Sequence, residues 1–314
     1  MKILVTGGAG FIASNIVDAY LQEGHEVVVI DNLSTGKKEN LNKKAKFYFV
    51  DICDRKKINE IFAKEKPEIV NHLAAQIDVR KAVADPVFDT TTNIIGIINI
   101  GENCVKYSTN KLIFSSSGGV IYGECKKPAK ESEIKPPISP YGISKFTSEL
   151  YLNYWKQIYR LNYTALRYGN IYGPRQEGGE AGVISIFIRA FLEGKQATIF
   201  GDGKQMRDYV YVGDVVDANV KALNNGENSS FNIGTGKATS VNELYKTIRE
   251  NFNSQQEPTY VPARPGELFK NVLDNGKAKK ILGWSPKINL KDGIAKTIDW
   301  FKSNPKSTSF SLFK

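Results

Sequence analysis

The chain has 314 residues, 41% of them hydrophobic and 24% charged, with a formal net charge of +10. This composition is typical of a globular chain in water, and no apolar run approaches the roughly 20 residues that span a bilayer. Lysines are spread along the whole sequence without a zinc-finger or aromatic–basic pattern, so we expect neither a nucleic acid nor a membrane as partner.

Short apolar runs alternate with helical segments through the first half of the chain. We predict strands at residues 2–8, 26–31, 46–51, 68–74, 111–117 and 162–170, and helices at about 11–23, 55–64, 92–107 and 141–159. Strands rich in Val, Ile and Phe that alternate with helices predict right-handed βαβ units and a doubly wound parallel α/β sheet.

After about residue 170 the alternation weakens, which predicts a smaller C-terminal α/β lobe interleaved with the first. We place one lobe at residues 1–170 and 209–236 and the other at residues 171–208 and 237–314.

The stretch VTGGAGFIA follows the first predicted strand and opens the first helix. Gly7 and Gly10 permit a tight turn that brings backbone amides to a pyrophosphate, and Ala13 suits the third position, where helix and strand pack closely. Asp31 ends the second strand, and its carboxylate can accept from both ribose hydroxyls and repel a 2′-phosphate. The pattern predicts a Rossmann domain that binds NAD rather than NADP.

Two further strand ends face the predicted dinucleotide. Asp51 ends the third strand and could meet the adenine amino group, although an aspartate here could also merely cap the following helix. The small residues in HLAA, at 72–75, let the chain pass close under the cofactor.

The stretch SPYGISK, at 139–145, places a tyrosine and a lysine one helical turn apart. Ser139 suits the N-cap and Pro140 the first helical position, so Tyr141 and Lys145 share a face. A nearby ammonium favours the phenolate of a tyrosine, whose pKa is otherwise about 10, and so provides a base near neutral pH. Taken alone, the pair also fits an ordinary surface helix.

Several motifs in one order extend this pattern over nearly the whole chain. They are the fingerprint at 6–13, SSS at 115–117, YGISK at 141–145, LRYGNIYGPRQ at 166–176, FGDGKQMRDYVYVGDV at 200–215 and RPGEL at 264–268. Together they resemble the extended short-chain dehydrogenase/reductase family, and within it nucleotide-sugar epimerases of the UDP-galactose 4-epimerase type. The resemblance implies that Tyr141 and Lys145 are the catalytic pair, that the first lobe binds NAD and that the second binds a nucleotide sugar.

The resemblance also implies a third catalytic hydroxyl at the end of the fifth strand. We choose Ser117 because it is the last of the three serines. Ser116 is the alternative, because the loop from Ser117 to Tyr122 is one residue longer than in typical members and the alignment can shift. Gly118 and Gly119 stand where 4,6-dehydratases of the family carry Asp-Glu, which disfavours dehydration.

The remaining site residues follow from the same resemblance. We predict cofactor contacts for Gly7, Gly10, Phe11, Ile12, Asp31, Asn32, Asp51, Ile52, Leu73, Ala74, Ala75, Asn93, Ser115, Tyr141, Lys145 and Tyr168. We predict substrate contacts for Ser117, Tyr141, Asn170, Val183, Arg207, Arg264, Glu267 and Asn271, and no metal site.

Three of these assignments have alternatives. Arg207, beside Asp208, could form a surface ion pair, and Asn93 could make a polar contact inside a helix. A shifted alignment would place Phe269 or Lys270, rather than Asn271, beside the sugar.

The function implied is that of an NAD-dependent isomerase of galactose metabolism. We expect it to interconvert UDP-glucose and UDP-galactose, and also UDP-N-acetylglucosamine and UDP-N-acetylgalactosamine, by transient oxidation at C4. We expect a homodimer formed by the two helices at 92–107 and 141–159, and a cytoplasmic location, because three scattered cysteines predict reduced thiols. The alternatives are a UDP-glucuronate epimerase, a GDP-sugar enzyme, or a non-catalytic NAD-binding protein, a class that typically lacks the Tyr or the Lys.

Overall fold

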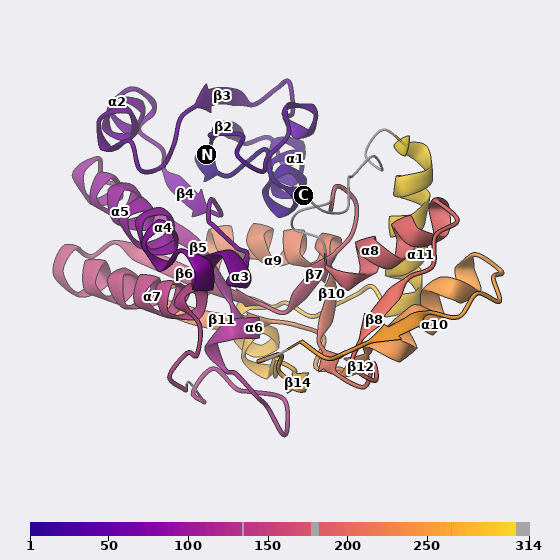
Figure 1. The fold of residues 1–314 in the computed structure, drawn as a ribbon. Coiled ribbons are helices and arrows are strands. Elements are labelled where there is room, and N and C mark those ends of the chain that lie inside the picture. Colours follow the sequence, from indigo (N-terminus) through magenta and orange to yellow (C-terminus); the bar gives the residue numbers. More distant parts are fainter. Residues whose placement is uncertain (134, 177–181, 265, 306–314) are drawn as a thin grey trace.

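The computed structural model describes residues 1–133, 135–176, 182–264 and 266–305. Its centre is a seven-stranded sheet in the order β11–β6–β5–β4–β1–β2–β3, in which every neighbouring pair is parallel (Figure 1). The strands are β1 (Lys2–Thr6), β2 (Glu26–Asp31), β3 (Lys46–Phe49), β4 (Ile69–His72), β5 (Lys111–Ser117), β6 (Asn162–Tyr168) and β11 (Ser229–Ile233). The doubly wound parallel sheet predicted from the sequence is confirmed.

Helices cover both faces of this sheet (Figure 1). The helices α1 (Phe11–Gln22) and α9 (Val212–Asn224) pack on one face, and α2 (Arg55–Glu65), α5 (Gly96–Lys106) and α7 (Pro140–Tyr159) pack on the other. Side chains alternate along β1, so that Ile3 and Val5 join the first core and Leu4 joins the second. Because both faces are buried there, the middle residues of β1 and β2 are apolar in succession.

The helix predicted at 92–107 begins earlier in the structure. It continues from α4 (Pro86–Thr90) through the π-helical segment η2 (Thr91–Ile95) into α5. Asp85 caps this start by accepting from the Phe88 amide, and Pro86 occupies the first turn. The sequence therefore contains a helix-start signal, Asp85–Pro86, which the hydrophobic pattern alone did not indicate.

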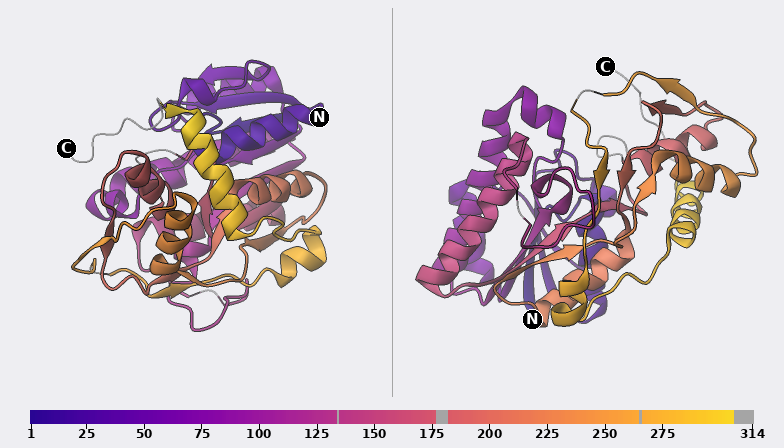
Figure 2. Two further views of the ribbon diagram at one scale, coloured as in Figure 1. Left: turned by 90° about the vertical axis from the view of Figure 1, so that its right-hand side faces the viewer. Right: turned by 90° about the horizontal axis from the view of Figure 1, so that it is seen from below.

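The second lobe is built from short elements around its own core. Its helices are α8 (Val183–Leu192), α10 (Val241–Asn251) and α11 (Leu290–Ser303), whose side chains include the buried Phe187, Leu244, Ile298 and Phe301. The short strands are β7 (Asn170–Tyr172), β8 (Thr198–Phe200), β9 (Met206–Arg207), β10 (Tyr209–Tyr211), β12 (Thr239–Ser240), β13 (Thr259–Val261) and β14 (Lys270–Asn271). Figure 2 shows this lobe beside the large sheet.

The remaining short elements connect the larger ones. They are η1 (Lys38–Asn40), α3 (Val79–Ala84), α6 (Gly118–Ile121) and η4 (Ala278–Leu282). Across the described part of the chain, no helix has the length and apolar character needed to cross a membrane.

A buried carboxylate anchors the end of the sheet at which β1 and β3 begin. Glu65, whose side chain is 2% exposed, accepts from Lys46 Nζ at 2.5 Å and Lys2 Nζ at 3.4 Å and also from the Tyr48 hydroxyl. Burial alone would raise the pKa of Glu65, but these hydrogen bonds outweigh it and hold the pKa at about 2.

This depressed pKa predicts a loss of stability in acid. The carboxylate stabilises the fold fully above the pH at which glutamate is ionised in the unfolded chain, and less as the pH falls toward 2. At neutral pH Glu65→Gln should lower the free energy of unfolding by about 2 kcal/mol, because hydrogen bonds to a charged group are lost. Urea denaturation of both proteins between pH 7 and pH 2.5 should show the difference shrinking with acidity, and a constant difference would contradict the assignment.

Candidate active site

The turn between β1 and α1 leads into a helix start that no side chain caps. Gly7 adopts φ +72°, and a Cβ added to it would lie 2.8 Å from the Ala74 amide nitrogen, so the turn needs glycine. Gly10 is the N-cap of α1 and supplies no side chain to bond the first helical amides. The amides at this helix end are thus left for a ligand, and they favour a phosphate.

Asp31 lies 7% exposed at the end of β2, beside this turn. Its Oδ2 accepts from the Ala9 amide at 2.9 Å and its Oδ1 from the Leu33 amide at 2.7 Å. Burial raises the pKa of Asp31, and the two backbone amides oppose that rise. A carboxylate has about four acceptor sites, so it can still accept from two further hydroxyls.

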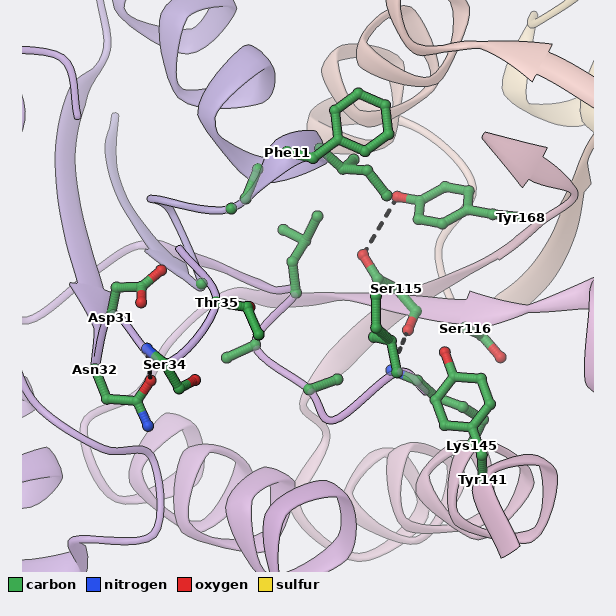
Figure 3. Close-up of a pocket in the computed structure, with 18 residues that line it drawn as sticks. Phe11, Asp31, Asn32, Ser34, Thr35, Ser115, Ser116, Tyr141, Lys145 and Tyr168 are labelled. Carbon is green, nitrogen blue, oxygen red and sulfur yellow. Dashed lines mark hydrogen bonds between the residues drawn. The ribbon is translucent and has the colours of Figure 1, made fainter. Parts of the chain in front are cut away.

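A pocket extends from Asp31 along the carboxyl ends of the strands to helix α7 (Figure 3). Asp31, Asn32, Ser34 and Thr35 lie at one end of it, and Ser115, Ser116, Tyr141 and Lys145 at the other (Figure 3). Of the residues predicted to bind the cofactor, the pocket is lined by Gly7, Gly10, Phe11, Ile12, Asp31, Asn32, Leu73, Ala74, Ala75, Ser115, Tyr141, Lys145 and Tyr168.

The pocket also contains residues that the sequence analysis missed. Ser34, Thr35 and Ile77 line it, from the loops after β2 and β4. The segment DNLSTG, which begins with the last residue of β2, was the signal for the first two. Ile77 carried no such signal, since only the fold of the loop turns it toward the pocket.

Three predicted cofactor residues lie outside this lining. Asp51 accepts from Asn32 Nδ2 at 2.7 Å and from the Cys53 amide at 2.8 Å, and Ile52 packs against the core. Asn93 is 3% exposed and exchanges two hydrogen bonds of 2.9 Å with the backbone of Gln76. Asn93 therefore holds the loop after β4, and direct cofactor contact by these three remains a prediction.

Helix α7 presents Tyr141 and Lys145 to the pocket. The predicted cap is present, since Ser139 Oγ accepts from the Gly142 amide at 3.1 Å. Lys145 Nζ donates to the Ser115 carbonyl at 2.9 Å and lies 5.8 Å from the Tyr141 ring centroid. Burial lowers the pKa of Lys145 to about 8, and the charges of Asp89 and Glu149 oppose that shift. The pair thus combines an ammonium and a phenol in a site where charge is weakly screened.

The three serines of β5 point to different partners. Ser115 Oγ donates to the Tyr168 hydroxyl at 3.3 Å, and Ser116 Oγ donates to Glu149 at 2.6 Å. Ser117 is half-buried at the strand end and makes no side-chain capping bond to α6. Ser116 lines the pocket and Ser117 does not, but the Ser116 hydroxyl is engaged by Glu149. The assignment of the catalytic hydroxyl to Ser117 therefore stays a prediction.

The predicted diphosphate residues lie on the second lobe and its junction with the first. Arg207 Nη2 is 3.6 Å from Glu267 Oε1, and the Arg264 guanidinium lies 3.7 Å from the Phe200 ring centroid. Arg207 does form an ion pair, but not with its neighbour Asp208, whose buried carboxylate accepts from Thr235, Gly236 and Leu273.

Three other predicted substrate residues lie at strand or helix ends. The Asn170 amide donates to the Asp208 carbonyl at 2.7 Å, and Val183 is the first residue of α8. Asn271 is 1% exposed, pairs in register with Arg207 and donates from Nδ2 to the Gly123 carbonyl at 2.9 Å and the Gly118 carbonyl at 3.4 Å. Its Oδ1 has no hydrogen-bond partner among the described residues. Phe269 is 54% exposed, so Asn271 is the residue of this segment that adjoins the Ser117–Gly118 loop.

In the described ranges no three His, Cys, Asp or Glu side chains gather to hold a metal.

Comparison with known proteins identifies a family and several similar proteins. A model of the NAD dependent epimerase/dehydratase family matches residues 3–234. A putative UDP-glucose 4-epimerase of Methanocaldococcus jannaschii is 48% identical over 97% of this chain and 100% of its own.

Two solved structures are similar over almost their full length. The UDP-glucose 4-epimerase of Thermotoga maritima with UDP-glucose has a TM-score of 0.96 at 50% identity, covering 97% of this chain and 100% of that one. The Thermus thermophilus UDP-glucose 4-epimerase in complex with NAD has a TM-score of 0.91 at 43% identity, covering 96% and 99%.

Proposed function

The chain belongs to the NAD-dependent epimerase/dehydratase family, and from this premise we propose that it is a UDP-sugar 4-epimerase that interconverts UDP-glucose and UDP-galactose. The observation that carries the proposal is one pocket with Asp31 and the open amides of α1 at one end and Tyr141 with Lys145 at the other. One end suits a dinucleotide, and the other can move a proton. A non-catalytic binding protein would not need the second end.

The residues present fit NAD. The Gly7–Gly10 turn suits its pyrophosphate, Asp31 suits a ribose with two free hydroxyls, and the same carboxylate disfavours the phosphate of NADP. Held there, NAD would supply a reversible hydride acceptor for C4 of the sugar and would not be consumed.

The chain's own residues then handle the proton and the orientation of the sugar. Tyr141, as phenolate, takes the proton of the sugar 4-hydroxyl and later returns it to the same oxygen. Lys145, as ammonium, favours that phenolate, and Ser117 hydrogen-bonds the C4 oxygen while it is a carbonyl. The glycines that follow Ser117 cannot exchange a proton, so loss of water from the sugar is not supported.

Two arginines are suited to the substrate diphosphate. Guanidinium groups bind phosphate oxygens through two parallel hydrogen bonds, and Arg207 and Arg264 both lie on the second lobe. We assign Glu267 to the uridine ribose, Asn170 to the diphosphate or sugar, and Val183 to the side of the nucleobase. Arg207 would exchange its 3.6 Å contact with Glu267 for the diphosphate when the substrate enters.

The proposal is tested by incubating the purified protein separately with UDP-glucose, UDP-N-acetylglucosamine, UDP-glucuronate and a GDP-hexose, and resolving the epimers by NMR. Conversion of UDP-glucose to UDP-galactose without added cofactor is expected, with NAD released on denaturation. Conversion of UDP-glucuronate or the GDP-hexose alone would favour those alternatives. No conversion of any sugar would favour a non-catalytic binding protein.

We also propose that the protein is a cytoplasmic homodimer. Ile143, Leu150, Tyr154 and Ile158 form an outward stripe on α7 at helical spacing, each at least 44% exposed. Val87 on α4 and Ile95 on η2 add exposed apolar area on the helix packed beside α7, at the left of Figure 1. A self-complementary face of this kind suits a two-fold dimer.

The dimer proposal predicts that Leu150→Glu produces monomers, because a charge would be buried on both sides of the interface. Sedimentation velocity at micromolar concentration should show a dimer for the wild type and a monomer for this variant. Ile281→Glu is the matched control, since Ile281 is 52% exposed on η4, away from the stripe. A monomeric wild type would contradict the proposal.

We further propose that Asn271 permits an N-acetyl group at C2 of the sugar. Asn271 is smaller than a tyrosine, and its unpartnered Oδ1 can accept from a sugar donor, while its Nδ2 is held by two backbone carbonyls. The carboxamide can therefore accept, rather than donate, a hydrogen bond on the side of the sugar.

Asn271→Tyr should then lower kcat/KM for UDP-N-acetylglucosamine by at least about 10-fold more than for UDP-glucose, by filling the space beside C2. Steady-state kinetics on both substrates measures the ratio. Asn271→Ala keeps the space open and removes only the Oδ1 acceptor, so it should change the ratio much less than the tyrosine variant. Equal losses on both substrates for the tyrosine variant would refute the assignment.

A further inference from the structure

A buried ion pair lies between helix α7 and the sheet, behind the proposed catalytic residues. Glu149 comes eight residues after Tyr141 and four after Lys145, so it shares their face of α7. The side chains of Glu149 and Arg167 are 8% and 3% exposed. Neither residue has a role predicted from the sequence.

The Glu149 carboxylate joins α7 to three adjacent strands. It accepts from Ser116 Oγ of β5 at 2.6 Å and from Ser230 Oγ of β11 at 2.9 Å. From β6, Arg167 donates through Nε at 2.9 Å to Oε1 and through Nη2 at 2.6 Å to Oε2. Both carboxylate oxygens are thereby held, and the planar guanidinium sets the direction of the contact.

The other edge of Arg167 holds the loop after Ser117. Its Nη1 donates to the Tyr122 hydroxyl at 2.7 Å and to the Glu131 carbonyl at 3.0 Å. Tyr122 directly follows α6, and Ser116 directly precedes Ser117. The segment that carries Ser117 is therefore anchored on the same ion pair at both of its ends.

We propose that the Glu149–Arg167 pair is a positioning pair, which sets Ser117 relative to Tyr141 and Lys145 for proton transfer. The assignment rests on the proposed epimerase function. A buried ion pair is by itself a weak source of stability, because the loss of hydration offsets its attraction. A pair that fixes two catalytic segments in one geometry instead acts on the rate, since small displacements of reacting groups reduce it strongly.

The pair also acts on the electrostatics of the site. Burial lowers the pKa of Lys145, and the charges of Asp89 and then Glu149 oppose that shift. Removing the charge of Glu149 lowers the pKa of Lys145, so the ammonium is lost at a lower pH. The alkaline limb of the kcat profile should move in the same direction, which a purely structural role would not cause.

The test compares the wild type with Glu149→Gln, the double variant Glu149→Gln/Arg167→Met, and Glu65→Gln as matched control. Glu65 is also a buried carboxylate paired with cations, but it lies away from the pocket. For each protein, kcat and KM on UDP-glucose, the pH profile of kcat, bound NAD and the melting temperature are measured.

Glu149→Gln should lower kcat about 10²-fold with little change in KM or bound NAD, and should shift the alkaline limb to lower pH. Glu149→Gln leaves the Arg167 cation buried without its carboxylate partner, and Arg167→Met removes that cation. The double variant should therefore regain stability but keep a low kcat. Glu65→Gln should lose stability and keep its kcat. This pattern separates a positioning role from a structural one.

Near wild-type kcat in folded Glu149→Gln would overturn the proposal, as would a double variant that regains kcat together with its melting temperature. If Glu149→Gln does not fold, the double variant decides between these outcomes. A wild type that converts no UDP-sugar overturns the proposed function, and the positioning role with it.

Discussion

Replacing Tyr141 by Phe should lower kcat for UDP-glucose by about 10³-fold while leaving NAD bound, because only the oxygen that exchanges the proton is removed. Tyr141 is 9% exposed on the pocket side of α7, and Phe retains the ring that packs there. Lys145 keeps its 2.9 Å bond to the Ser115 carbonyl, and the Asp31 end of the pocket is untouched by the change. NMR of the sugar products and assay of nicotinamide after denaturation measure the two quantities separately.

Tyr151→Phe is the matched control for this variant. Tyr151 lies ten residues further along α7, where its ring packs against Trp155. Loss of its hydroxyl should leave turnover unchanged. Near-normal activity in Tyr141→Phe would show that the proposed base is wrong, whatever the control does.

Replacing Gly7 by Ala should yield a folded protein that is purified with little NAD and is correspondingly inactive. Alanine at φ +72° costs about 1–2 kcal/mol, and its Cβ would lie 2.8 Å from the Ala74 amide nitrogen and 2.9 Å from Ala74 Cα. Neither neighbour is a flexible side chain, so the turn itself must shift. The shift moves the amides that would bind the pyrophosphate.

Nicotinamide per protein chain, with circular dichroism as the test of folding, measures this outcome. Gly24→Ala is the matched control, since Gly24 also has a positive φ, of +81°, but no atom within 4 Å of an added Cβ. It should lose a little stability and keep its NAD. A full complement of NAD in folded Gly7→Ala would contradict the assigned role of the turn.

The sequence predicted the elements whose signals are local. Ser139 and Pro140 start α7 as expected, and Gly7 occupies the turn that its position in the fingerprint required. The strand β11 went unrecognised as a strand, since SSFNI is short and half polar and pairs only along one edge. A strand of this kind is defined by its neighbour β6 rather than by its own composition.

Contacts between distant parts of the chain could not be predicted in the same way. Arg207 pairs with Glu267, 60 residues away, although Asp208 is adjacent in sequence. The buried Glu149–Arg167 pair left no pattern in either segment. Such pairings depend on the packing of α7 against the sheet, which a linear motif does not encode.

The path of the chain through the large sheet limits how the protein can be divided. The chain leaves the sheet after Tyr168, builds part of the second lobe, and returns at Ser229 to supply the edge strand beside β6. A fragment ending near residue 170 would expose the backbone of β6 as an open edge, which favours aggregation. The lobes therefore cannot be expressed as separate gene fragments, and calorimetry should record one melting transition for the whole chain.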